Sequence, residues 1–185
     1  MKTKLSALLQ LTPAALLTLT GAASVSAADD YFLKIDGIPG ESQDAKHKGE
    51  IELGSFSWAV ANSGSTAVGG GGGAGKASFQ DFAITAQMSK ASPKLFLACA
   101  SGEHIKSALL TVRRAGKEQL EYYTIKMEDV LVSRVENSAA DGAAPGDAVT
   151  FNFSKITWTY RSQKADGTLD TPVPAYWDLK QNKGG

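Results

Sequence analysis

The sequence contains a single cysteine, Cys99, and only two histidines, His47 and His104. One cysteine excludes an intramolecular disulfide and a cysteine-rich zinc site. The two histidines lie far apart in the sequence, and no cysteine or carboxylate near either of them has the spacing of zinc ligands. We therefore expect no metal, no cofactor and no catalysis that depends on histidine.

The sequence also lacks an excess of charge, because 19 lysines and arginines are matched by 19 aspartates and glutamates. A protein that holds nucleic acid on a basic surface needs a cationic excess, so this class of partner is excluded. With 43% hydrophobic and 21% charged residues, the 185-residue chain has the composition of a folded globular protein. At roughly 150 residues per domain, it is long enough for one domain.

Motifs that mark catalysis are missing as well. There is no Gly-x-Ser-x-Gly nucleophile elbow, and the carboxylates are scattered singly. Residues 70–76 fit the Gly-x-x-x-x-Gly-Lys part of a phosphate-binding loop, but Ala77 stands where a magnesium-binding hydroxyl belongs, and a strand-like pattern follows. Cys99 lies in an apolar stretch, where a thiol is usually a buried core residue. We predict no enzymatic activity and no nucleotide binding.

The N-terminal apolar run, residues 5–19, is too short and too interrupted for a membrane span. Two lysines precede it and small residues follow at positions 25–28, which is the layout of a secretory signal peptide. We predict that residues 1–28 are a signal peptide and that residues 29–185 form a single mature domain. The mature protein is then secreted or periplasmic and has no stable membrane anchor.

Alternation of apolar and polar residues, the pattern of half-buried strands, dominates the remaining sequence. The parity of this alternation changes around Gly54-Ser55, as a β-bulge would cause, and again near Ser154. The pair Asp166-Gly167 indicates a tight turn. We expect about eight strands, in residues 31–35, 51–60, 82–88, 105–113, 120–127, 130–135, 149–160 and 176–179.

One helix is predicted, with Ser92 as its N-cap, Pro93 as its first residue and Gly102 as its stop. Residues 62–76 include seven glycines and can bury little apolar surface, which predicts a long loop. The predicted fold is therefore mainly β: a small antiparallel β-barrel or sandwich of two sheets, with one short flanking helix and a long glycine-rich loop.

Several stretches between residues 31 and 180 resemble one known family in order and without a large gap. The most specific stretch supplies the residues His47, Gly49, Ile51, Glu52, Ser55, Phe56, Ser57 and Trp58. Further stretches are residues 34–42, 79–82, 92–96, 101–105, 130–133 and 165–167. On these residues the sequence resembles the haemolysin-coregulated protein (Hcp) family, the tube-forming proteins of type VI secretion systems.

The resemblance implies a small β-barrel of two antiparallel sheets with one flanking helix and an extended loop. It also implies an assembly, because members form six-membered rings that stack into a hollow tube and are expelled with effectors inside or attached. The implied partners are the protein itself, as a homo-hexamer, and type VI secretion components or effectors; no residue is catalytic. We expect contacts between stacked rings from residues 139–144 and from Gly69, Gly70, Gly71, Gly72 and Gly73.

The predicted signal peptide departs from the family, because typical tube proteins stay in the cytoplasm and leave through the secretion apparatus. Two functions therefore stay open. The first is a structural, self-assembling ring protein linked to type VI secretion. The second is an exported binding module that reuses the barrel to bind a surface, a polysaccharide or a partner protein.

Overall fold

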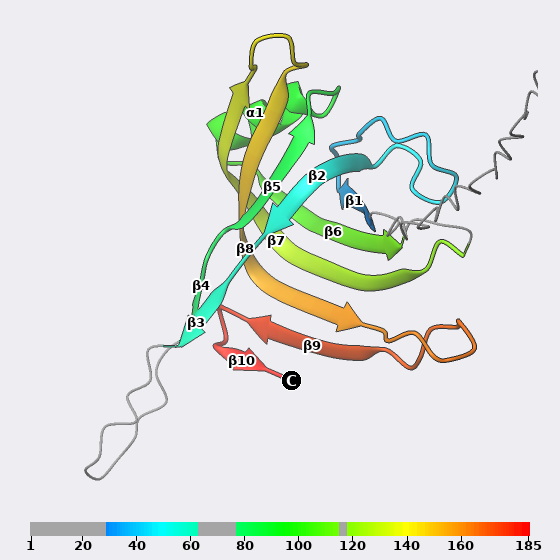
Figure 1. Ribbon diagram of the computed structural model, residues 1–185. Coiled ribbons are helices and arrows are strands. Elements are labelled where there is room, and N and C mark those ends of the chain that lie inside the picture. Colours follow the sequence, from blue (N-terminus) through cyan, green and yellow to red (C-terminus); the bar gives the residue numbers. More distant parts are fainter. Residues whose placement is uncertain (1–28, 63–76, 115–117) are drawn as a thin grey trace, which may run out of the picture.

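The computed structural model describes residues 29–62, 77–114 and 118–185 (Figure 1). The predicted signal peptide, the five consecutive glycines and the phosphate-loop-like motif lie outside the described residues. The strands are β1 Asp29–Ile35, β2 Ile51–Ser57, β3 Val60–Asn62, β4 Ala77–Phe79, β5 Phe82–Gln87, β6 His104–Arg114, β7 Glu121–Ser138, β8 Gly146–Tyr160, β9 Val173–Asp178 and β10 Lys183–Gly184, and the helix is α1 Ser92–Ser101.

Six strands close into an antiparallel barrel in the order β8-β5-β2-β1-β6-β7, with β7 pairing back onto β8. Strands β9 and β10 extend the sheet beyond the barrel from β8, and β3 and β4 form a separate two-stranded ribbon (Figure 1). The prediction of a mainly β, antiparallel barrel with one short helix is confirmed for the described part of the chain. The three strands that were not predicted have only two or three residues each, too few to show a periodic pattern.

The parity changes seen in the sequence mark real irregularities in long strands. The register between β2 and β5 shifts between Leu53 and Ser55, which confirms the bulge at Gly54. Strand β8 is continuous, but its two halves have different partners: residues 146–151 pair with β5 and residues 155–160 pair with β9. The change near Ser154 therefore coincides with the point where β8 leaves the closed barrel.

One long strand, β7, replaces the two strands predicted at residues 120–127 and 130–135. Asp129 lies between these segments with a φ of 53°, a left-handed conformation that interrupts regular alternation without ending the strand. Both neighbouring ladders continue past it, with Glu128 facing Ser107 and Val130 facing Ile105. The local conformation of one residue therefore explains why the pattern is that of two strands.

The barrel interior is filled by side chains of all six strands and of α1. Its largest fully buried members are Phe82, Phe151, Leu33, Leu110, Ile125, Met127 and Ile156. The closed interior removes a large apolar area from water, at about 25 cal/mol per Å², and thereby fixes the positions of the strands and of the surfaces they carry. None of the helices in the described ranges is long and apolar enough to cross a membrane.

Helix α1 begins one residue earlier than predicted, at Ser92 instead of Pro93. Ala91 occupies the N-cap without a side-chain hydrogen bond, and Ser92 is the first helical residue. The Ser92 hydroxyl instead donates a hydrogen bond to the carboxylate of Asp147 at the start of β8. At the other end, Gly102 adopts the left-handed conformation with a φ of 68°, and its N–H bonds to the Ala98 carbonyl, as predicted.

Candidate functional site

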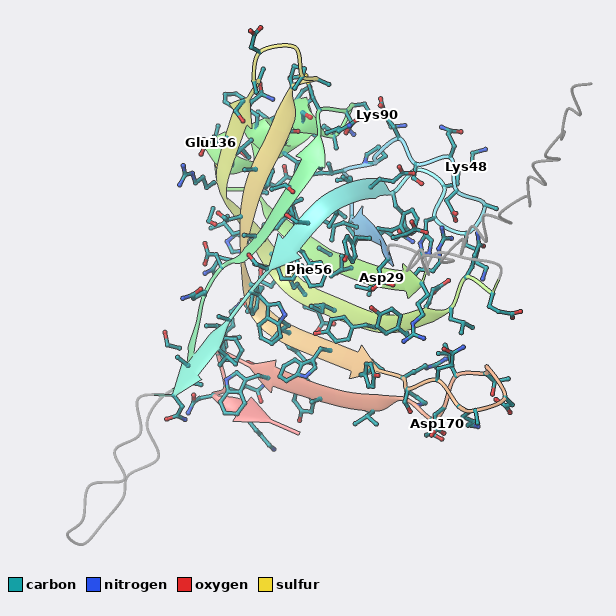
Figure 2. The ribbon with its side chains drawn as sticks, viewed as in Figure 1. Asp29, Lys48, Phe56, Lys90, Glu136 and Asp170 are labelled. Atoms are coloured by element: carbon teal, nitrogen blue, oxygen red, sulfur yellow. The ribbon has the colours of Figure 1, made fainter. Side chains whose placement is uncertain are left out.

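The residues that carry the family resemblance do not converge on one site. They follow the chain from the β1–β2 loop through β2, and the structure uses them mainly to close and pack the barrel (Figure 2). Ile51 is buried, and Phe56 packs edge-on against Tyr31 and stacks with Phe82. Trp58 packs against Trp158, with ring centroids 5.4 Å apart.

His47 is the buried anchor of the β1–β2 loop. Its ring stacks on Phe32 at 4.2 Å, and its Nδ1 lies 3.0 Å from a carboxylate oxygen of Glu50. Its Nε2 has no hydrogen-bond partner in the described part of the chain, and the nearest carboxylate, on Glu121, lies 3.6 Å away. Gly49 turns the chain beside it with a φ of 75°. His47 therefore fixes the loop against β1, and its contacts among the described residues are with Phe32, Glu50 and Glu121 rather than with a nucleophile.

A buried ion-pair cluster holds the same loop on the barrel. Arg113 of β6 is 4% exposed and lies 2.8 Å from Asp30 of β1 and 2.7 Å from Asp44 of the loop. The guanidinium carbon of Arg113 also lies 4.7 Å from the centre of the Phe32 ring, which is a cation–π contact. Composition and motifs gave no sign of this cluster, because its members are 83 and 69 residues apart along the chain.

The electrostatics of the cluster favour its charged form. Burial alone would raise the pKa of Asp44, but hydrogen bonds from Arg113 and from the backbone N–H groups of Lys46 and His47 outweigh it and lower the pKa. Burial alone would likewise lower the pKa of Arg113, but the hydrogen bonds to Asp30 and Asp44 raise it. The cluster is therefore a permanent ion pair near neutral pH, suited to structure rather than proton transfer.

A second polar cluster is centred on Asp129. Its carboxylate accepts hydrogen bonds from His104 at 2.7 Å, from Ser154 at 2.6 Å and from Lys180. The hydrogen bond from Lys180, followed by those from Ser154 and His104, holds the pKa of Asp129 well below its usual range. Ser154 and His104 each bind the aspartate and make no hydrogen bond with each other among the described residues, so the three side chains are not arranged as a catalytic triad. The cluster ties the C-terminal segment to β6, β7 and β8.

The outer face of the β2, β5, β8 and β7 strands is lined by small hydroxyl residues. Ser55 bonds to Thr85 at 2.7 Å across β2 and β5, and Ser133 bonds to Thr150 at 2.8 Å across β7 and β8. Ser57 is exposed on the same strand as Ser55. The hydroxyls of Ser55 and Thr85, and those of Ser133 and Thr150, therefore satisfy each other's hydrogen bonds. These side chains carry no charge and little apolar surface.

Helix α1 carries apolar residues on its solvent side. Leu95 and Ala98 are buried against the barrel, whereas Phe96 is 66% exposed and Leu97 is 63% exposed. The exposed apolar residues follow helical spacing of i, i+3, i+4 and i+7, and we call them the helix stripe: Pro93, Phe96, Leu97 and Ala100. The spacing was visible in the sequence, but which of the two apolar sides faces the barrel was not.

Cys99 lies between the two sides of α1. It carries a free thiol and packs against the core as predicted, but it is only partly buried there. The turn predicted to contact other rings, residues 139–144, joins β7 to β8 and is exposed throughout. Gly142 turns it with a φ of 73°. The described residues contain no group of three or more His, Cys, Asp or Glu side chains that could hold a metal ion.

A second exposed apolar surface lies where the sheet leaves the barrel. Tyr160 of β8 is 47% exposed and Val173 of β9 is 67% exposed, and the two residues face each other directly in the ladder. Pro172 and Pro174 flank Val173 and are exposed as well. We call these four residues the β8–β9 patch. Figure 1 shows α1 at one end of the molecule and β9 at the other, so the two apolar surfaces are well separated.

Comparison with known proteins decides the family. A family model described as "Type VI secretion system effector, Hcp" matches residues 32–160, well over half of the chain. The chain belongs to the Hcp family. It is 44% identical over 158 residues to the protein hcp1 of Pseudomonas aeruginosa, an alignment that covers 84% of this chain and 98% of that relative.

Solved structures show the same Hcp fold. One, described as the structure of a type six secretion system protein, superposes with a TM-score of 0.81 at 30% identity and covers 85% of this chain and 100% of that one. The crystal structure of Hcp1 from Salmonella typhimurium gives a TM-score of 0.72 at 36% identity, covering 85% and 99% of the two chains. The resemblance noted in the sequence is therefore confirmed.

Proposed function

We propose that residues 29–185 form a structural subunit that associates with itself into six-membered rings in a type VI secretion system. The observation that carries the proposal is the similarity to Hcp proteins along the whole length of the relatives, 98% of the Pseudomonas aeruginosa protein. Such similarity favours an assembly role over an exported binding module. A module with a new function needs only the barrel fold, and nothing would then preserve similarity along the full length of the relative.

The surface supports an assembly role in physical terms. Monomeric proteins rarely expose clustered large apolar side chains, yet this chain does so at two separate places, the helix stripe and the β8–β9 patch. Two different surfaces on one subunit suit a head-to-tail contact, whose rotation either closes a ring or continues as a filament. The role that we propose is structural and not enzymatic.

Rings of this kind can also stack, and the same proposal extends to tubes that carry type VI effectors. The candidates for contacts between rings are the exposed turn of residues 139–144 and the glycines 69–73, which come between β3 and β4 in the sequence. Export through the predicted signal peptide, residues 1–28, would deliver the subunit to the periplasm or the medium.

Size-exclusion chromatography with light scattering on residues 29–185 tests the ring. The full chain weighs 19.4 kDa, so a mature subunit weighs roughly 17 kDa and six subunits about 100 kDa. We expect the hexameric mass at micromolar concentration and rings in negative-stain images. A monomer across about a hundredfold range of concentration would refute the proposal. Deleting residues 69–73 is the control for stacking: the ring should persist while tube length changes.

A further inference from the structure

We infer that the Asp141–Gly142 pair is a site of spontaneous isomerisation, at which the main chain is rerouted through the side chain of Asp141 to give an isoaspartyl linkage. The reaction is independent of the proposed function. The chain has three Asp-Gly pairs, at positions 36–37, 141–142 and 166–167. Among the described residues, only the turn between β7 and β8 leaves both the carboxylate and the glycine N–H of its pair without a partner.

The reaction needs no enzyme and no cofactor, because both reacting groups belong to adjacent residues. The backbone nitrogen of the glycine attacks the side-chain carboxyl carbon of the aspartate. A C–N bond forms, the bond to the carboxyl hydroxyl breaks, and the hydroxyl leaves with the amide proton as water. The cyclic imide then takes up one water. Opening at the main-chain carbonyl gives isoaspartate, with an extra methylene in the main chain, whereas opening at the side-chain carbonyl restores aspartate. Glycine favours the attack because it has no Cβ beside the nitrogen.

The turn at residues 140–143 leaves both reacting groups free. It is closed by a hydrogen bond from the Ala143 N–H to the Ala140 carbonyl at 3.0 Å, and Gly142 is its third residue, with a φ of 73°. The N–H at this position of a β-turn takes no part in the closing bond. Within the described ranges, the Asp141 carboxylate accepts no hydrogen bond, and both residues are exposed. A Cβ added to Gly142 would meet nothing within 4 Å, so the turn has room to rearrange.

The Asp36–Gly37 pair occupies the same positions of a similar turn, but its carboxylate is held. The Ile38 N–H bonds to the Ile35 carbonyl at 3.2 Å, and Gly37 has a φ of 80°. The Asp36 carboxylate accepts a hydrogen bond from the Ser107 hydroxyl of β6 at 2.9 Å, and the Asp36 N–H donates to the Ser107 carbonyl at 3.1 Å. Because the carboxyl group must turn onto the glycine nitrogen to react, the bond to the Ser107 hydroxyl has to break first.

The Asp166–Gly167 pair is held at both reacting groups. The Asp166 carboxylate accepts hydrogen bonds from the Thr168 hydroxyl at 2.7 Å and from the Thr168 N–H at 2.9 Å, and these bonds lower the pKa of Asp166. A carboxyl group must carry its proton to lose its hydroxyl as water, so a lowered pKa leaves fewer reactive molecules at neutral pH. The Gly167 N–H donates to the Lys164 carbonyl at 3.0 Å and is not free to attack.

Peptide mapping of aged protein tests the site. Residues 29–185 are kept folded at neutral pH and physiological temperature, and samples taken over several weeks are digested. Isoaspartyl and aspartyl peptides have the same mass, but they separate by chromatography and give different fragment ions on electron-transfer dissociation. We expect isoaspartate to form at Asp141 at least about fivefold faster than at Asp36 or Asp166, which is the factor that one hydrogen bond of ordinary net strength supplies.

Two controls separate the effect of the fold from that of the local sequence. In denaturant the turns are lost, so the three pairs should react at similar rates; a preference for Asp141 that persists there overturns the role of the turn. Ser107→Ala removes the hydroxyl that holds Asp36 and should raise isomerisation at Asp36 about fivefold while the rate at Asp141 stays the same. Equal rates at the three pairs of the folded protein, or no isoaspartate at Asp141, overturn the inference whatever the oligomeric state.

Discussion

Replacing Arg113 by methionine removes the cation at the centre of the buried ion-pair cluster. The substitution keeps most of the side-chain volume but leaves Asp44, which is 17% exposed, without its charge partner, and frees Asp30, which is 40% exposed. Breaking a fully buried ion pair costs about 3–5 kcal/mol because an uncompensated charge remains. Since Asp30 can be hydrated where it stands, we expect a smaller loss of unfolding free energy, about 2–4 kcal/mol.

The measurement is equilibrium unfolding by denaturant at a fixed protomer concentration, followed by tryptophan fluorescence, because Trp58, Trp158 and Trp177 all pack against the core. Arg134→Met is the matched control. Arg134 also pairs with a carboxylate, Glu136, but the two side chains are 67% and 50% exposed, so this loss should be below about 1 kcal/mol. If Arg113→Met costs no more than Arg134→Met, the cluster does not stabilise the loop and our reasoning is wrong.

The pH dependence of unfolding, measured for the parent protein and for Arg113→Met, tests whether the ion pair of Asp44 causes this loss of stability. The folded state lowers the pKa of Asp44, so its contribution to stability is fully present above the unfolded-state pKa, near 3.8, and is lost as the pH falls through the folded-state value. We therefore expect the difference between the parent and Arg113→Met to be constant near neutral pH and to shrink below about pH 4. A difference that grows on acidification would contradict this sign.

The remaining predictions concern export, packing and the glycine-rich motif. Intact-mass analysis of exported material should find a chain that begins at Ala28 or Asp29; unprocessed full-length protein alone would contradict the signal peptide. Leu95→Ala should cost about 2–4 kcal/mol of unfolding free energy, because Leu95 is 2% exposed, whereas Cys99→Ala should cost about 1 kcal/mol or less, because the thiol is only partly buried. Calorimetry should find no saturable binding of ATP with magnesium, and a signal that disappears in Lys76→Ala would refute this.

Local chemistry made several features predictable from the sequence. Gly54, Gly102 and Gly167 mark the bulge, the helix stop and a turn, because each position uses a backbone conformation or a close approach that glycine permits. The N-cap prediction failed for a reason that local rules cannot include. The hydroxyl of Ser92 binds Asp147, which is 55 residues away in the sequence, and so does not cap its own helix.

The candidate assembly surfaces depend on tertiary structure in the same way. The sequence of α1 has two apolar sides, and only the packing of the helix on the barrel determines that Leu95 is buried while Phe96 is exposed. The Arg113 cluster was unpredictable because Asp30, Asp44 and Arg113 come from three segments that the closed barrel brings together. The resemblance identified the family from sequence alone, whereas the roles of individual side chains needed the fold.

The β7–β8 ribbon determines how the two apolar surfaces are oriented relative to each other. Its ladder runs from the Ser138–Gly146 pair to the Tyr123–Tyr160 pair. Helix α1 contacts β7, and Tyr160 belongs to the β8–β9 patch at the far end of the ribbon (Figure 1). An 18-residue strand at about 3.3 Å per residue spans at most roughly 60 Å, so the twist of the ribbon sets the angle between the surfaces at its two ends. Asp129 lies within this ribbon and accepts hydrogen bonds from His104 of β6, from Ser154 of β8 and from Lys180, so it links the ribbon to β6 and to the C-terminal segment.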